Sequence, residues 1–107
     1  MMAERGVPEE VEAGFAADEI GARWTYAGAL TYANAGAVLA AAAKLALPTT
    51  GAIDLADIDA MDSTAVAVLV ALKRRAAGEG KPLTFVDVPA ALTALAELYG
   101  VEEILVA

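Results

Sequence analysis

Residues 51–66 read GAIDLADIDAMDSTAV, and this stretch decides the fold. Its first half is a short apolar segment after a glycine, with Ile53 and Leu55 at alternate positions, as is typical of a buried central β-strand. Either Ser63 or Asp62 then caps a helix, because both residue types accept hydrogen bonds from the free N–H groups at a helix start. A buried strand that is followed at once by a helix indicates an α/β fold.

Outward from this stretch, strands and helices alternate along the chain. An Ala-rich segment upstream has apolar residues at helical spacing, with Thr31 or Asn34 available as its N-cap, and downstream Pro89 begins a helix that Gly100 ends. Strands that are separated by helices run parallel. We expect one α/β domain over residues 11–107, after a tail over residues 1–10. The expected elements are strands over residues 11–17, 23–27, 51–58, 82–88 and 101–106, helices over residues 31–47, 64–77 and 90–99, and an acidic loop over residues 59–62.

Composition limits the function classes. The 107 residues contain no Cys and no His, which excludes zinc fingers, thiol nucleophiles and Ser-His-Asp triads. The net charge of −8 repels phosphate backbones and anionic lipids, so we expect no nucleic-acid binding. The mean hydropathy is +0.57, but Lys44 and Lys73 interrupt the longest apolar runs well short of the roughly 20 residues of a membrane span, so we expect no membrane insertion. The acidic residues 1–12 lack the apolar core of a signal peptide, and we expect a cytoplasmic protein.

The densest polar group consists of Asp54, Asp57, Asp59 and Asp62. The spacing fails the calcium-loop pattern, which leaves a magnesium site as an alternative to plain solvation of a strand end. The chain has no glycine-rich nucleotide loop, and the Ser63 hydroxyl has no histidine or lysine base beside it. We therefore predict a protein without catalytic residues, cofactor or metal site.

The helix after Ser63 is apolar on every side over two turns. A helix that packs on a sheet needs one apolar stripe, which Val66, Leu69 and Val70 supply. Val68 and Leu72 then lie nearer the opposite face, where they belong to a partner surface or are covered by neighbouring helices; the residues leave both open. The basic residues 73–75 suit the negative end of the helix and are predicted to be solvated.

Ser63 has two roles that are compatible with each other. As an N-cap it accepts a backbone N–H and contributes about 1 kcal/mol. As a phosphoacceptor it would carry about −1.5 to −2 charges at the positive end of a helix, close to Asp59 and Asp62. Such a modification would switch a partner surface.

From about Arg23 to Leu105 the chain resembles a STAS domain, the module named for sulfate transporters and anti-sigma-factor antagonists. The residues Gly28-Ala29-Leu30 are similar to the family's strand ending before its first helix, and Ile53 to Val66 is similar to its central Asp-Ser segment, with Ala65 in place of the usual glycine. The resemblance implies a four- to five-stranded, mostly parallel sheet with helices on one face.

Two branches of the family remain open. In anti-sigma-factor antagonists the serine at the position of Ser63 is phosphorylated by a partner kinase. The stretch 94–105 is more similar to the cytoplasmic STAS subunit of Mla-type phospholipid-transport ABC systems, which maintain outer-membrane lipid asymmetry. That branch implies contact with the ATPase subunit, in a complex with the permease at the inner membrane, and no nucleotide binding by this chain. A free-standing binder of small molecules is a third alternative. The resemblance places the partner interface at Asp62, Ser63, Thr64, Val66, Val68, Leu72, Arg75 and Tyr99.

Overall fold

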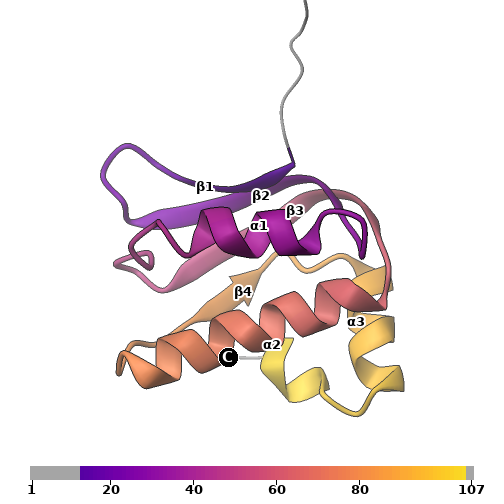
Figure 1. Ribbon diagram of the computed structural model, residues 1–107. Coiled ribbons are helices and arrows are strands. Elements are labelled where there is room, and N and C mark those ends of the chain that lie inside the picture. Colours follow the sequence, from indigo (N-terminus) through magenta and orange to yellow (C-terminus); the bar gives the residue numbers. More distant parts are fainter. Residues whose placement is uncertain (1–12, 106–107) are drawn as a thin grey trace, which may run out of the picture.

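Strand β3 (Ala52–Met61) is the centre of the fold in the computed structural model, which describes residues 13–105 (Figure 1). It runs parallel to β2 (Arg23–Leu30) on one side and to β4 (Thr84–Val86) on the other. Strand β1 (Gly14–Ala17) pairs antiparallel with the outer side of β2, which gives the order β1-β2-β3-β4. The predicted α/β fold with a four-stranded, mostly parallel sheet is therefore confirmed.

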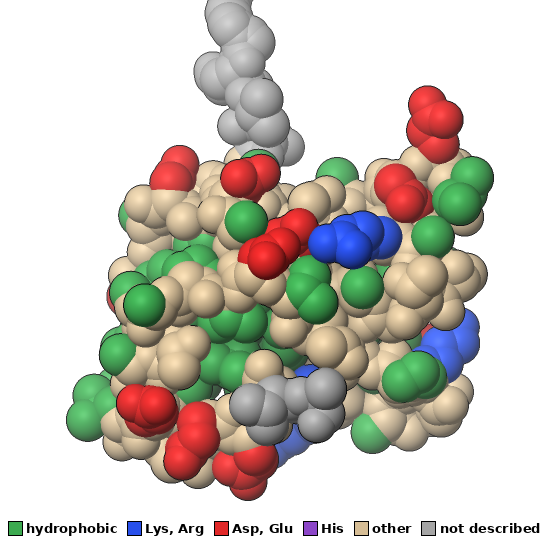
Figure 2. All heavy atoms as spheres, turned by 180° about the vertical axis from the view of Figure 1, so that it is seen from behind, with side chains coloured by type: hydrophobic (Ala, Val, Ile, Leu, Met, Phe, Trp, Pro, Cys, Tyr) green, Lys and Arg blue, Asp and Glu red, His purple; other side chains and the backbone are tan. Residues whose placement is uncertain are grey.

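Helices α1 (Ala35–Ala42) and α2 (Ser63–Gly78) lie against the same face of the sheet (Figure 1). Helix α3 (Ala90–Leu98) and the short 3-10 helix η1 (Glu102–Leu105) pack beside α2. Figure 2 shows the molecule from behind, the side of the sheet that α1 and α2 leave open. The elements beside α2 are thus the ones that can form a surface with it.

The core lies between the sheet and the helices. Trp24, Ile53 and Phe85 occupy one register row across β2, β3 and β4, and all three side chains are buried. The indole Nε1 of Trp24 donates to the Ala46 carbonyl oxygen at 3.1 Å, so burial leaves its one polar group paired. This row fixes the register of the sheet under the helices.

The predicted last strand over residues 101–106 is wrong where it can be compared, because residues 102–105 form η1 and residue 106 lies outside the described residues. Strand alternation would place Glu102 and Ile104 on the same face. The 3-10 turn instead leaves Glu102 and Glu103 exposed and buries Leu105. Burial of the apolar side chains without the carboxylates explains the difference.

The strand boundaries also differ from the prediction. Strand β4 covers three residues of the predicted 82–88, because Asp87 takes a left-handed backbone with φ 55°, which a strand does not accommodate. Strand β3 continues through most of the predicted acidic loop and ends at Met61. Strand β2 likewise continues past its expected end to Leu30, with which Met61 is paired.

Helix α1 is shorter than the predicted 31–47. The Asn34 side chain accepts from the Thr31 N–H at 2.9 Å and donates to the Ala29 carbonyl oxygen at 2.8 Å, which holds the residues before the helix in a turn. Asn34 is the N-cap residue, as predicted, but its side chain makes no capping hydrogen bond to α1. A side chain that binds the preceding loop cannot also cap the helix.

Candidate functional site

The junction between β3 and α2 is fixed by one carboxylate. Asp62 accepts from the Thr64 N–H at 2.9 Å and from the Tyr32 N–H at 3.0 Å. It is therefore the N-cap of α2, and it also ties the loop after β2 to this helix start. Both bonds favour the charged form and so lower the pKa of the Asp62 carboxyl below its ordinary value; the bond from the Tyr32 N–H has the larger effect.

Of the two predicted N-caps, Asp62 takes the role, whereas Ser63 begins helix α2 rather than capping it, so the prediction is wrong for Ser63. Its side chain is exposed, and no hydrogen bond joins the hydroxyl to another residue within 13–105. Ala65, which stands where the family pattern has glycine, is fully buried. Its methyl group therefore points into the core and leaves the approach to Ser63 open.

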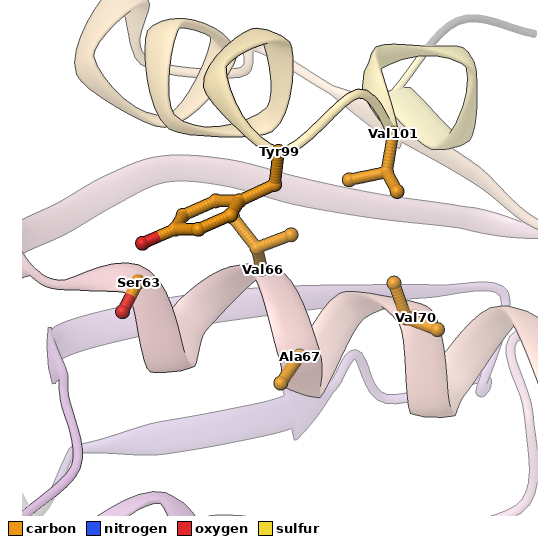
Figure 3. A pocket seen from close by; sticks show the side chains of 6 residues that line it. All are labelled: Ser63, Val66, Ala67, Val70, Tyr99 and Val101. Atoms are coloured by element: carbon orange, nitrogen blue, oxygen red, sulfur yellow. The ribbon is translucent and has the colours of Figure 1, made fainter.

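A groove of about 300 Å³ runs along α2 from Ser63 (Figure 3). Tyr99, at the end of α3, lies across the groove with its hydroxyl directed toward the Ser63 end (Figure 3). Besides Ser63 and Tyr99, the lining consists of apolar side chains, Val66, Ala67, Val70 and Val101. Tyr99 is 56% exposed and the neighbouring Leu98 is 74% exposed, so apolar surface continues beyond the groove.

Of the predicted interface residues, the structure brings Ser63, Val66 and Tyr99 together in the groove. Asp62 lies beside it, with its carboxylate engaged as described, and Thr64 is half-buried. The other three predicted interface residues, Val68, Leu72 and Arg75, belong to α2 but do not line the groove.

Val68 and Leu72 are 1% and 2% exposed, so the expectation that they face a partner is wrong and the alternative of coverage by neighbouring elements holds. Arg75 is also directed inward, since its guanidinium donates to the carbonyl oxygens of Ala42 at 3.0 Å and Leu45 at 2.6 Å. Arg75 thereby joins the C-terminal part of α2 to the end of α1. Its side chain has a structural role that the sequence does not reveal.

Sequence reasoning missed Ala67, Val70 and Val101 as lining residues. The sequence pattern predicts that Val70 faces the sheet, but its side chain is only half-buried. A signal was present, because positions 63, 67 and 70 follow one another at intervals of four and three and so form one stripe of α2.

The four aspartates are dispersed rather than gathered. Asp54 pairs with Arg23 at 3.0 Å on the open side of the sheet, and its carboxylate also accepts from the Ala56 N–H at 2.8 Å. The bond from Ala56, with help from Arg23, lowers the pKa of Asp54. Within residues 13–105 no group of three or more acidic side chains is arranged to hold a metal ion.

The basic residues 73–75 divide into two engaged side chains and one exposed one. Lys73 donates to the carbonyl oxygen of Leu83 and lies 5.6 Å from the centre of the Phe85 ring. With Arg75 bound to α1, the exposed Arg74 is the member that is solvated as predicted. No helix in the described part of the chain is both long enough and apolar enough to span a bilayer.

Comparison with known protein families agrees with the fold described above. A family model described as "Mlab, STAS domain" matches residues 14–107, a range that includes every strand and helix described within 13–105 and the groove. Comparison with the curated proteins gives no match. STAS domains are generally non-catalytic binding and regulatory modules. With nearly the whole chain matched and the expected sheet and helices in place, the protein belongs to the STAS domain family.

Proposed function

We propose that this chain is the STAS subunit of an Mla-type phospholipid-transport ABC system, in which it binds the ATPase subunit and stabilises or regulates it. The carrying observation is the match to the Mlab-type STAS model over residues 14–107. In this proposal the chain lies in the cytoplasm and reaches the inner membrane only through the ATPase and the permease.

The groove along α2 is the proposed contact surface. Val70 and Tyr99 present apolar surface there, and aromatic side chains in such positions often supply much of the binding energy of an interface. The groove lies between α2, which covers the sheet, and the end of α3, which packs beside α2, so the surface is formed before a partner arrives.

Co-expression with the Mla-type ATPase of the same genome tests the proposal. We expect the ATPase to be retained on the tagged chain. We expect Tyr99→Ala and Ser63→Glu to weaken the complex by about tenfold or more, because each alters the lining of the groove. Ile20→Ala removes a similarly exposed apolar side chain from the turn between β1 and β2 and should leave the affinity unchanged. Failure of the wild-type chain to retain the ATPase would refute this function.

A second candidate is an anti-sigma-factor antagonist that is controlled by phosphorylation of Ser63. The exposed hydroxyl, free of hydrogen bonds to residues 13–105, is the observation that favours it. A phosphate at this position would meet the positive end of α2 but also the carboxylate of Asp62. Intact mass measurement of the chain from its native cells tests it: phosphate on Ser63, together with recovery of a serine kinase instead of the ATPase, would favour the antagonist.

A further inference from the structure

The segment that carries Tyr99 and Val101 has negative charges only. Residues 82–107 contain no Lys or Arg, while Glu97, Glu102 and Glu103 lie in or beside the elements that form the Tyr99 and Val101 side of the groove. All three glutamates are exposed. Figure 2 shows acidic and hydrophobic side chains gathered at the lower left, where α3 and η1 lie in that view. We call Glu97, Glu102 and Glu103 the acidic wall, because they are exposed on the elements next to Tyr99 and Val101 although they do not line the groove themselves. Such negative charges beside an apolar groove disfavour partners that are themselves acidic.

The opposite side of the groove supplies little positive charge. Lys73 and Arg75 of α2 are engaged with backbone carbonyl oxygens. Arg74, one turn after Val70, is the exposed cation of this helix and lies beyond the end of the groove lining. The acidic wall is therefore not neutralised by α2.

The length of the groove along α2 suits a short helical segment of a partner. From Ser63 to Val70 the lining covers two turns of α2, or about 10 Å. A groove of this kind accepts the apolar stripe of an amphipathic helix, with contacts at helical spacing.

We propose that the groove binds an amphipathic helix of a partner protein whose apolar stripe is flanked by Lys or Arg on the side that meets Glu97, Glu102 and Glu103. The inference rests on the proposed function, since it names the chemistry of the ATPase segment that enters the groove. A second copy of this chain is an unfavourable occupant, because it would bring another acidic wall and a net charge of −8. An anionic membrane surface is excluded for the same reason.

Two synthetic peptides of about 18 residues, with identical Leu and Ala faces and either Lys or Glu on the polar faces, test the chemistry without the ATPase. We expect the Lys peptide to bind at least about tenfold more tightly than the Glu peptide, and less tightly at about 1 M salt than at 0.1 M. Its NMR shift changes should be concentrated at Ser63, Val70, Tyr99 and Val101. Changes spread over the acidic surface, equal binding of both peptides, or self-association of the chain through this face would overturn the inference.

Charge variants of the full chain test the same inference for binding of the ATPase. Glu102→Lys with Glu103→Lys should weaken binding of the Lys peptide and of the ATPase by about tenfold or more. Glu19→Lys with Asp57→Lys changes the net charge equally, from −8 to −4, at exposed positions in the first turn and on β3, and should change both affinities by less than about threefold. The neutral pair Glu102→Gln with Glu103→Gln gives an intermediate loss and serves if the lysines disturb η1.

The two proposals fail in different ways. If the ATPase binds equally well to the wild-type chain and to the Glu102→Lys, Glu103→Lys variant, the inferred charge pattern is wrong while the proposed function stands. If the ATPase does not bind but the Lys peptide occupies the groove, the proposed function is wrong while the chemistry of the groove stands.

Discussion

Replacing Arg75 with methionine should destabilise the fold but leave the lining of the groove unchanged. The guanidinium donates to the carbonyl oxygens of Ala42 and Leu45, where α1 has ended, and its Nε donates to Glu79 at 3.0 Å. Methionine keeps most of the apolar stem but removes every donor, so the change isolates the hydrogen bonds from the packing.

The magnitude follows from the partners. A hydrogen bond from a charged group contributes about 1.5–3 kcal/mol when its partner is shielded from water. The Arg75 side chain is 25% exposed, and water can reach the freed carbonyl oxygens, so we expect a total loss of about 2 kcal/mol rather than the sum of two bonds. The ion pair with Glu79, 40% exposed on the Glu side, adds little. For a domain of this size a loss of about 2 kcal/mol lowers Tm by about 10 °C.

Urea unfolding followed by far-UV circular dichroism measures the effect. Arg74→Met is the matched control, because the neighbouring residue has the same charge but is exposed, and its substitution should change the free energy of unfolding by less than about 0.5 kcal/mol. Glu79→Gln should also have a small effect. Equal stability of the Arg74 and Arg75 variants would show that Arg75 does not join α1 to α2, and would return it to the candidate interface residues.

Two further predictions concern the backbone and the helix start. Gly51→Ala should lower the free energy of unfolding in urea by about 2–3 kcal/mol, because φ of Gly51 is 78° and the new Cβ would lie 2.7 Å from the Pro82 carbonyl oxygen. The control Gly36→Ala in α1 should be neutral or stabilising, because a Cβ there meets nothing within 4 Å. Equal effects of the two substitutions would refute the strain at Gly51. Asp62→Asn keeps one of the two acceptor oxygens of the carboxylate. Because the pKa of Asp62 is lowered in the folded chain, the wild-type protein should be more stable than the variant at about pH 7, and this difference should disappear as the pH falls through that pKa. A stability difference that persists in acid would contradict the role of the carboxylate.

The central part of the fold follows from the sequence because several local signals agree there. Ile53 and Leu55 alternate into the core as predicted, and the helix predicted over residues 64–77 differs from α2 by one residue at each end. The pattern of strand, helix and strand then requires parallel pairing on both sides of β3.

The errors arise where a contact distant in sequence decides the outcome. Nothing around Asp62 predicts that its second oxygen binds the Tyr32 N–H, which is 30 residues away. Likewise, the periodicity of α2 does not reveal which apolar stripe α3 and η1 cover. It therefore leaves Val68 open between a partner and neighbouring helices, and it places Val70 on the sheet side although Val70 lines the groove. Arg75 lies in a run of basic residues whose ordinary interpretation is solvation.

The apolar character of α2 on all sides follows from its position. The sheet and the neighbouring elements bury Ala65, Val66, Val68, Leu69, Leu72 and Ala76. The stripe of positions 63, 67, 70 and 74 is left with small or apolar residues until Arg74, although a solvent-facing stripe would ordinarily be polar throughout. The carboxylate of Asp62 fixes the start of this stripe, and Arg75 holds the helix to the end of α1 beyond the groove. An exposed apolar surface of this kind lowers solubility unless a partner protein covers it, and this is the physical reason to expect a partner at the groove.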